Sequence, residues 1–288
     1  MAETLVILNP TARSTRAISQ YAKIRELPGI DALEITAAPG DARALAEWAV
    51  EKGFRTVVAA GGDGTVNEVV NGLAGSDVTL GVLPVGTMNV FAAELGISSR
   101  LRDAWKVIQH GTMRKVDLAC ANRHYFVQLA GVGLDAQVVK ETSLQLKKNF
   151  GPLSYLISAA HVAARKPPVL HLTTGDGRTT QGSFVLIGNG RFYGGPITFF
   201  QEARIDDGLL DVLVFKNLSH MDIARYLGHV LMRRHTSLED VEYFQTRKVM
   251  VRSEEAVPVE VDGEVMAELP VTFRIASKKL RVWTPALK

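Results

Sequence analysis

Short apolar runs alternate with stretches of helical spacing over the first 118 residues. In 40–53, for example, Leu45 and Trp48 fall on one helical face, and Gly53 is well placed to end the helix. A similar spacing predicts a helix over 14–27. The apolar runs are expected to be buried strands, at 4–10, 30–36, 56–60, 78–84 and 113–119. Strands alternating with helices predict an α/β domain with a doubly wound, mostly parallel sheet.

The pattern changes after about residue 120, where strand-like stretches dominate and Asp-Gly or Gly-Asp turns separate them. Two helical stretches interrupt these strands, at roughly 141–165 and 219–233. The strand-like stretches are 124–130, 168–174, 179–188, 209–216, 240–252, 257–261 and 270–283. We therefore predict two domains, an α/β domain over 1–120 and a largely antiparallel β domain over 121–288.

Composition narrows the class of protein. The 288 residues are 47% hydrophobic and 22% charged, which excludes a disordered chain and suits one or two globular domains. The net charge of +3 comes without a basic block, so no nucleic-acid binding is expected. No stretch approaches the roughly 20 apolar residues of a membrane span, and the first residues lack the basic region of a signal peptide. The single cysteine, Cys120, suits a reducing cytosol.

The most informative segment is VVAAGGDGTVNEVVNGL, from Val57 to Leu73, in which an apolar strand leads into a helix. Three residues at the junction are glycines: Gly61, Gly62 and Gly64. They let backbone N–H groups turn toward an anion without a Cβ in the way. Thr65 and Glu68 have the spacing of a capping box, and the free N–H groups of a helix N-terminus favour phosphate. The segment predicts a phosphate-binding loop, although it is neither a Walker A loop nor a dinucleotide-binding fingerprint.

Asp63 lies inside this loop. A carboxylate in a phosphate site is unfavourable unless it holds a metal or takes a proton, so Asp63 suggests Mg²⁺. The alternative is a tight strand-to-helix turn without a ligand, although such a turn does not need a buried aspartate.

A second strand–turn–helix segment follows at 80–92 and contains Gly86 and Thr87. If its strand lies beside the first, in parallel, both turns meet at the carboxyl edge of the sheet, where such sheets bind ligands. On its own the segment would be an ordinary capped helix. Beside the first loop it predicts the other side of a nucleotide cleft.

Taken together, these motifs resemble the diacylglycerol kinase catalytic-domain family, particularly bacterial soluble lipid kinases and, more distantly, sphingosine kinases. The resemblance spans essentially the whole chain. It rests on Asn9-Pro10, Thr36 with Gly40-Asp41-Ala42, and the runs GGDGTVNEVVNGL, LPVGTMNVFA, IDDGLLDV and VDGE. The family implies a nucleotide domain related to that of NAD kinase and phosphofructokinase, then a C-terminal antiparallel β-sandwich domain, with the active site between them.

Carried over position by position, the resemblance implies roles for residues in both domains. Those assigned to ATP are Asn9, Thr36, Gly61, Gly62, Asp63, Gly64, Thr65, Asn67, Glu68, Gly86 and Thr87. Those assigned to Mg²⁺ are the carboxylate of Asp207 and the carbonyls of Arg204 and Leu209, which are oxygen ligands of the kind that Mg²⁺ prefers. Glu264 is implied as the proton acceptor, and Asp63 is a rival for this catalytic role.

Both acidic segments also have a simpler interpretation, because Asp207-Gly208 and Asp262-Gly263 are common hairpin turns. The sequence departs from the family pattern in three places. Thr11-Ala12-Arg13 follows Asn9-Pro10, Val90 stands where an acidic residue is common, and Gln201-Glu202-Ala203-Arg204 lacks the usual proline.

Residues 140–166 combine basic ends with a broad apolar face, broken at Gly151-Pro152. Such a helix can dock on an anionic bilayer and admit an acyl chain. A core helix or a dimer helix with snorkelling lysines fits the same composition, so a homodimer stays open. We expect a cytoplasmic protein that is peripheral at the inner face of the membrane.

The combined prediction is an ATP-dependent, Mg²⁺-requiring lipid kinase that phosphorylates a hydroxyl of diacylglycerol or a related lipid alcohol. An NAD kinase-like enzyme acting on a soluble nucleotide would keep the same glycine loop. A non-catalytic nucleotide-binding membrane sensor would keep the same fold.

Overall fold

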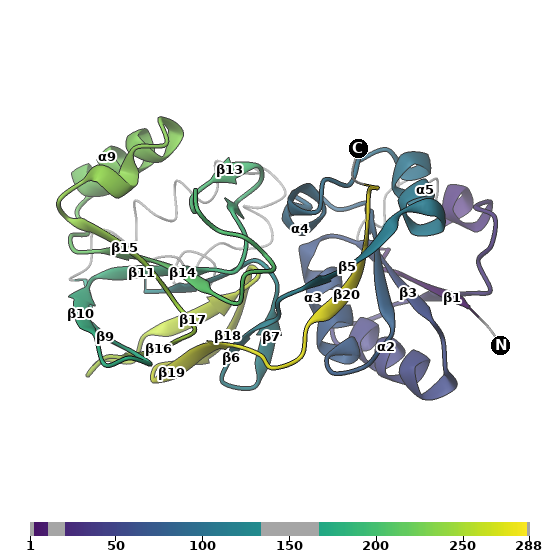
Figure 1. The fold of residues 1–288 in the computed structure, drawn as a ribbon, viewed down its shortest axis with the longest axis horizontal. Helices are drawn as coiled ribbons and strands as arrows, with labels where there is room; N and C mark the ends of the chain where they lie inside the picture. The colour runs from purple at the N-terminus through teal and green to yellow at the C-terminus, as the bar shows by residue number, and fades with distance from the viewer. Residues whose placement is uncertain (1–2, 11–20, 134–166, 287–288) are drawn as a thin grey trace. The chain divides into compact units, whose positions relative to one another are not determined.

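The structure, a computed structural model, describes residues 3–10, 21–133 and 167–286 (Figure 1). The predicted helix over 141–165 lies outside these residues. Of the one predicted over 14–27, residues 21–25 are described and are helical. The chain forms two compact units. Unit 1 comprises Met1–Leu118 and Ser277–Lys288, and unit 2 comprises Ala119–Ala276.

Unit 1 is built on a six-stranded sheet in the order β2-β1-β3-β4-β20-β5. The first four of these strands are parallel, β20 is parallel to β4, and β5 is antiparallel to β20. The bounds are β1 Thr4–Leu8, β2 Ala32–Ile35, β3 Thr56–Gly61, β4 Thr79–Pro84, β5 Thr112–Val116 and β20 Leu280–Thr284. The predicted α/β architecture is confirmed.

The helices of unit 1 are α2 (Asp41–Lys52), α3 (Asp63–Leu73), α4 (Val90–Glu94) and α5 (Leu101–His110). Figure 1 shows α2 and α3 on one side of the sheet and α5 on the other. Gly53 ends α2 in the left-handed conformation, as predicted. A Cβ on Gly72 would lie 2.6 Å from Arg43 O and 2.7 Å from Ala46 Cβ, so this glycine allows α3 to pack closely on α2.

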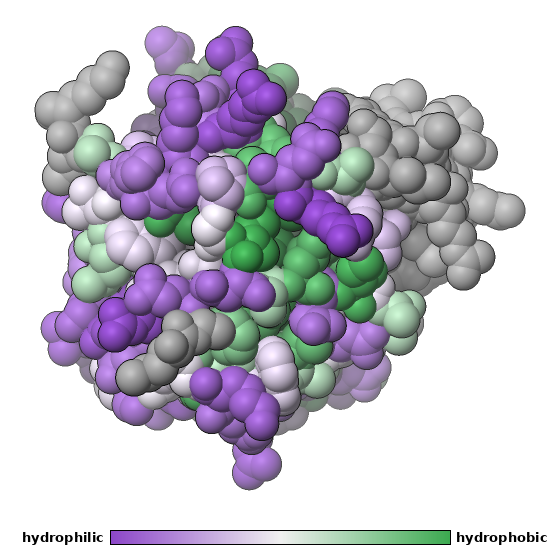
Figure 2. Space-filling view, turned by 90° about the vertical axis from the view of Figure 1, so that its right-hand side faces the viewer, coloured by the Kyte–Doolittle hydropathy of each residue, from purple (hydrophilic) through white to green (hydrophobic). Residues whose placement is uncertain are grey.

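The core of unit 1 lies around its central strands. Every residue of β3 and β4 is buried, as expected for parallel strands with helices on both faces. The space-filling view shows hydrophobic residues gathered in the middle of one face, surrounded by hydrophilic ones (Figure 2). The large apolar side chains of unit 1 that are more than a third exposed, among the described residues, are Ile35, Trp48 and Met113.

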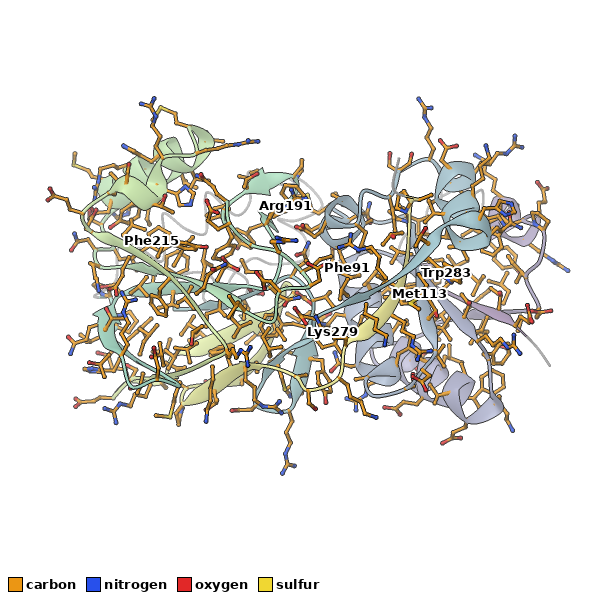
Figure 3. All side chains as sticks on the ribbon, viewed as in Figure 1. Phe91, Met113, Arg191, Phe215, Lys279 and Trp283 are labelled. Carbon is orange, nitrogen blue, oxygen red and sulfur yellow. The ribbon has the colours of Figure 1, made fainter. Side chains whose placement is uncertain are left out.

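The predicted domain ranges, 1–120 and 121–288, differ from the two units at the end of the chain. The stretch predicted as strand-like over 270–283 contains β19 (Val271–Ile275) in unit 2 and β20 in unit 1. Trp283 on β20 is paired with Met113 on β5, and both are labelled in Figure 3. The apolar pattern is similar in the two strands, and only their pairing partners separate them.

Unit 2 contains two six-stranded antiparallel sheets, in the orders β10-β9-β16-β19-β6-β7 and β15-β14-β11-β8-β17-β18. The strands of the first sheet, besides β19, are β6 Ala119–Ala121, β7 His124–Phe126, β9 Leu170–Thr174, β10 Thr179–Gly182 and β16 Lys248–Arg252. Those of the second are β8 Leu129–Val132, β11 Phe184–Gly188, β14 Leu210–Phe215, β15 Val241–Thr246, β17 Pro258–Val261 and β18 Glu264–Glu268. The predicted β-sandwich is confirmed.

Two apolar clusters stabilise unit 2. One contains inward side chains of both sheets and forms the core of the sandwich. The other lies on the second sheet beneath α9 (His220–Leu231), where Phe215 of β14 contacts Tyr226 of the helix with ring centroids 4.9 Å apart (Figure 3). A small sheet of β12 (Phe192–Tyr193) and β13 (Ile197–Thr198) and the 3-10 helix η1 (His235–Ser237) complete the described part of the unit.

Among the residues that the structure describes, no helix combines the length and the apolar character needed to cross a membrane.

Candidate functional site

The predicted phosphate loop lies at the carboxyl edge of the unit 1 sheet. The register pairs Gly61, the last residue of β3, with Pro84, the last residue of β4. The segments that follow these strands are therefore neighbours, as the sequence predicted. Asn9 follows β1 and Thr36 follows β2, and these strands run parallel to β3. Four of the predicted nucleotide segments thus converge on one edge of the sheet.

The two loops touch through their backbones. A Cβ on Gly86 would overlap the Cα of Gly62 and lie 2.9 Å from its N. The Gly86 N–H donates to the carbonyl of Gly61 at 3.2 Å. A Cβ on Gly62, by contrast, would meet the Cα of Gly86 at 3.5 Å, an ordinary contact. Position 86 therefore requires glycine for packing, whereas an alanine at 62 is compatible with the fold and adds a methyl group to the loop.

Asn89 stabilises the second loop, and its role was not predicted. Its side-chain Oδ1 accepts from the Gly86 N–H at 3.1 Å, and its Nδ2 donates to the Gly86 carbonyl at 2.9 Å. Asn89 itself has a left-handed φ of 50°, which asparagine tolerates better than most residues. In the sequence, this role could have been inferred only from the position of an asparagine three residues after a turn glycine.

The predicted capping box of α3 is wrong. The helix begins at Asp63, with Gly62 as its N-cap, and no described side chain caps it. Thr65, the expected cap, lies inside the helix, and its Oγ1 accepts a hydrogen bond of 2.9 Å from Asn9 Nδ2. This contact ties the end of β1 to the first turn of α3. Because the helix starts earlier than predicted, its first N–H groups belong to the glycine loop itself.

Glu68, the other half of the predicted box, caps the neighbouring helix. Its two carboxylate oxygens accept the N–H groups of Gly40 and Ala42, each at 3.0 Å, at the start of α2. An acidic side chain at a helix N-terminus is favoured by the helix macrodipole. The carboxylate assigned to ATP by resemblance is therefore occupied by α2.

Asp63 also binds a helix N-terminus. Its Oδ1 accepts from the N–H of Phe91, in the first turn of α4, at 3.2 Å (Figure 3). Burial raises the pKa of Asp63, and hydrogen bonds from the backbone N–H groups of Phe91, Val90 and Asn89 oppose that rise. The sequence suggested that an aspartate in this loop needs a metal or a proton. The half-buried Asp63 is instead stabilised by the backbone of α4.

The remaining features of the edge suit an anion. The N-terminus of the 11-residue helix α3 supplies N–H groups that helical geometry leaves without helical acceptors. The carboxylate of Asp63 bonds to α4, and that of Glu68 bonds to α2. Thr36 is buried, and Thr87 is exposed on the second loop. The residues present therefore fit the phosphates of a nucleotide.

In unit 2, the predicted metal segment forms a turn immediately before β14. Asp207 Oδ1 accepts from the Leu209 N–H at 2.9 Å, and the Asp207 N–H donates to the Arg204 carbonyl at 3.5 Å. Gly208 has a φ of +79°. The three predicted ligands belong to one turn. The hairpin interpretation is wrong here, because β14 pairs with β11 and β15 and not with a strand directly before the turn.

Asp211 lies next to this turn and was not singled out from the sequence. It is fully buried, its Oδ1 accepts from Tyr243 Oη and from Gln245 Nε2 (3.1 Å), and its Oδ2 has no partner among the described residues. Burial raises the pKa of Asp211 to about 6, and the carboxylates of Asp207 and Glu202 add to the rise. This negative environment favours a cation.

The donor set at the Asp207 turn consists of one carboxylate and two carbonyls. Within 3–10, 21–133 and 167–286, no three His, Cys, Asp or Glu side chains are grouped so that they could hold a metal. Oxygen-only ligation that includes backbone carbonyls is compatible with Mg²⁺. The turn and the orphaned oxygen of Asp211 therefore fit a magnesium ion that also uses water ligands.

Glu264 is the first residue of β18 and is exposed. The turn before it joins β17 to β18, so the simple hairpin interpretation describes the local structure correctly. Asp262 has a φ of 48° and Gly263 a φ of +89°. The position of Glu264 at the end of this turn leaves its carboxylate accessible to solvent.

Two acids that were not assigned roles hold this turn. The Asp262 carboxylate accepts three backbone N–H groups, from Val127 (3.1 Å), Gln128 (3.0 Å) and Leu129 (3.1 Å). Glu260 is fully buried, and its Oε2 accepts from the Gly263 N–H at 2.7 Å. Hydrogen bonds from N–H groups to a carboxylate are strong. Asp262 and Gly263, the two residues before Glu264, are therefore held in place.

Two family models match the chain. The model "Diacylglycerol kinase catalytic domain" matches residues 3–121, and the model "YegS C-terminal NAD kinase beta sandwich-like domain" matches residues 128–284. Together they account for both units.

Individual proteins are similar over nearly the same length. A diacylglycerol kinase from Staphylococcus carnosus (strain TM300) is 30% identical, over 97% of this chain and 94% of its own. A protein named "Probable lipid kinase YegS-like" from Chromohalobacter salexigens is 34% identical, over 91% and 86%. A crystal structure of a diacylglycerol kinase from Bacillus anthracis str. Sterne superposes with a TM-score of 0.79 at 25% identity, over 98% of this chain and 97% of that chain.

Proposed function

Because the chain belongs to the diacylglycerol kinase family of lipid kinases, we propose that it transfers the γ-phosphoryl group of ATP to a hydroxyl of diacylglycerol or a related lipid alcohol. The observation that carries the proposal is the pair of glycine loops at the carboxyl edge of the unit 1 sheet. They lie in a chain whose family match extends over both units.

In this proposal, unit 1 binds the nucleotide. The N–H groups at the start of α3 and the backbone of the Gly62 and Gly86 loops hold the phosphates, and Thr36 and Thr87 line the same edge. Phosphoryl transfer needs little covalent chemistry from the protein, so positioning and charge stabilisation supply most of the catalysis. Asn9 and Asp63 then serve to hold the loops, through Thr65 and α4, rather than to react.

Unit 2 supplies the proton acceptor. The carboxylate of Glu264 takes the proton of the acceptor hydroxyl as the new P–O bond forms, a step that requires hydrogen-bond contact with that hydroxyl. Asp262 and Glu260 position the turn that carries Glu264. Asp63 is the weaker candidate for this role, because its carboxylate is half-buried and accepts a hydrogen bond from α4.

Mg²⁺ bound with the nucleotide would neutralise charge on the phosphates. A second, structural ion would be held by the carboxylate of Asp207 and the carbonyls of Arg204 and Leu209. We propose Mg²⁺ for both positions on the chemistry of their oxygen ligands. The membrane contact predicted for 140–166 falls on residues outside the described ones, and it remains part of the proposal, as does a peripheral location at the cytoplasmic face.

The direct test is transfer of labelled γ-phosphate from ATP, with Mg²⁺, to lipids in mixed micelles. Diacylglycerol, monoacylglycerol and sphingosine are offered separately, beside a lipid-free control. Label in an organic-extractable product with one of them establishes the activity and names the acceptor. Label that appears only in the aqueous phase, when NAD is added, would replace the proposal with the nucleotide kinase alternative. Binding of ATP without transfer to any acceptor would favour the sensor.

Variants separate the proposed roles. Glu264→Gln should lower kcat about 100-fold or more, as loss of a general base does, with ATP affinity unchanged. Glu268→Gln, an exposed acid at the other end of β18, is the matched control and should retain activity. Full turnover in Glu264→Gln would refute the base assignment. Gly62→Ala should keep the fold and weaken ATP binding, and unchanged ATP affinity would count against the loop.

A further inference from the structure

The helix α9 of unit 2 carries an apolar outer face. Its inner side, with Tyr226 and Val230, packs on the second sheet, and Figure 1 shows the helix lying over β15, β14 and β11. At about 3.6 residues per turn, the residues on the opposite side share small or apolar side chains. They are Met221, Ala224, Gly228, Leu231 and, one residue beyond the helix, Met232.

This outer face is highly exposed. Met221, Leu231 and Met232 are 83%, 73% and 57% exposed, and they are the three most exposed large hydrophobic residues of the described chain. A Cβ on Gly228 would have no neighbour within 4 Å, so the surface between the two ends of the helix is open. Scattered exposed apolar residues need no explanation, but a stripe along one helix with no polar residue in its centre is typical of an interaction surface.

The charges next to the stripe are basic. From Ile223 to Leu238 the sequence contains three arginines and no acidic residue. Arg233 and Arg234 directly follow the apolar end of the stripe. Both are exposed, and neither pairs with a carboxylate of another described residue.

Two acids that contact the helix, Asp222 and Asp240, are paired with an arginine. Arg225 pairs with Asp222 at 3.0 Å and with Asp240, and Asp222 also forms the capping box of the helix with Ser219. These contacts raise the pKa of Arg225 and lower the pKa of Asp240. A partner that approaches the outer face of α9 meets apolar side chains bordered by Arg233 and Arg234, which form no ion pair with the described residues.

We propose that this face of α9 docks on an anionic phospholipid bilayer. Leu231 and Met232 would enter the boundary between headgroups and acyl chains, and Arg233 and Arg234 would bind lipid phosphates. Charge complementarity favours this occupant over a second copy of the chain, because a second copy that docked through the same face would bring the same two exposed arginines to the contact. The inference rests on the proposed function for its choice of a lipid surface, and it names a contact separate from 140–166.

Binding of the full chain to vesicles tests this surface without any turnover. Vesicles of phosphatidylcholine mixed with phosphatidylglycerol are compared with vesicles of phosphatidylcholine alone by co-sedimentation. The protein should bind the first and not the second, and added salt should weaken binding, because the arginine contribution is screened. Absence of binding to the anionic vesicles would overturn the proposal.

Paired substitutions then locate the contact. Arg233→Gln with Arg234→Gln should weaken binding about 25-fold, from roughly fivefold for each positive charge at the membrane surface. Leu231→Glu with Met232→Glu should weaken it at least tenfold, on the order expected for losing two inserted side chains. The controls lie on β16 of the other sheet: Lys248→Gln with Arg252→Gln, and Met250→Glu, whose side chain is 37% exposed. Equal losses in the β16 variants would refute the assignment to α9.

Gly228 offers a test by charge sign at a position with open space. Gly228→Arg should strengthen binding to anionic vesicles, and Gly228→Glu should weaken it. The two variants place side chains of comparable reach at one position, so a shared folding defect would change both in the same direction. An identical effect of the two charges would contradict the proposal.

Two further measurements separate this inference from the kinase proposal and from self-association. The α9 variants should phosphorylate lipid in neutral detergent micelles as the natural sequence does, because no α9 residue is placed in the reaction. A protein without lipid kinase activity that still binds anionic vesicles through α9 would leave this inference standing and remove the other. Concentration-dependent dimers that Leu231→Glu abolishes, without vesicle binding, would instead assign the face to a second copy.

Discussion

The glycines of the candidate site segments are required for different reasons in the two units. In unit 1, Gly86 lies against the backbone of Gly62, so the neighbouring chain excludes a side chain. In unit 2, Gly208 and Gly263 have open space around them but adopt φ values of +79° and +89°, which are costly for residues with a Cβ. Crowding therefore selects glycine where phosphates are proposed to bind, and backbone conformation selects it beside the acidic turns.

The acidic residues of the candidate site segments also differ between the units, in the backbone groups that their carboxylates bind. In unit 1, Asp63 and Glu68 bind the N-termini of neighbouring helices and so hold the layers together. In unit 2, the carboxylate of Asp262 binds three N–H groups of one loop, and that of Asp207 binds within its own turn. An acidic residue near a candidate site can therefore have a structural role, in which its carboxylate accepts backbone N–H groups. Several substitutions test this role and the roles of the glycines.

The largest effect is expected for Gly86→Ala. The new methyl group would overlap the backbone of Gly62, which cannot rotate away as a side chain does, so we expect a loss of about 3 kcal/mol in the free energy of unfolding. Urea denaturation measures this change. Gly62→Ala is the matched control and should unfold near the natural midpoint. An unchanged midpoint for Gly86→Ala would show that the loops separate without cost.

Asp211 should make stability depend on pH. Its folded pKa of about 6 lies above the ordinary aspartate value of about 3.9, so the folded state binds more protons than the unfolded state between these values. Stability from this group is present below pH 4 and is lost as pH rises toward 6, on the order of 3 kcal/mol in total. We expect the difference between the natural protein and Asp211→Asn to follow that window when both are unfolded with a chelator present. A difference that does not vary with pH would refute the raised pKa.

Asp262→Asn should destabilise unit 2 by about 2 kcal/mol. An amide oxygen can still accept a hydrogen bond, but the negative charge and the second acceptor oxygen are lost to Val127, Gln128 and Leu129. Hydrogen exchange at these three amides reports the change locally. Glu254→Gln, an exposed acid in the loop after β16, is the control. Unaltered protection of the three amides would mean that Asp262 does not hold the loop.

The smallest effect is expected at Gly263. Gly263→Ala should cost about 1 kcal/mol, because alanine must adopt a left-handed φ, and Gly263→Asn should cost less, because asparagine tolerates that region better. No steric contact distinguishes the two, since the space around the position is open. Thermal unfolding of both variants measures the order. An equal and large loss of stability in both variants would indicate steric crowding, as at Gly86.

Much of the fold could be predicted because local patterns encode it. The apolar runs at 4–10 and 56–60 became β1 and β3, and the helical spacing over 40–53 became α2. The resemblance to the diacylglycerol kinase family is also confirmed. It could be recognised because the motifs of the family are continuous segments. These features depend on residues that are neighbours in the sequence.

The wrong predictions concern partners that are distant in the sequence. Thr65 and Glu68 have the local spacing of a capping box, yet their partners are Asn9 and the start of α2. Asp262 bonds to a loop more than 130 residues earlier, and no local pattern could indicate this. The assignments of ATP, Mg²⁺ and the base Glu264 stay predictions, because they concern ligands and a reaction rather than the chain's own contacts.

The position of β20 has a consequence for the order of events during synthesis. β5 is made before unit 2, but its partner in the unit 1 sheet is β20, which a ribosome adds only after unit 2 is finished. Until then, β4 presents an open edge and β5 has no place in the sheet. Unit 1 thus begins first and is completed last.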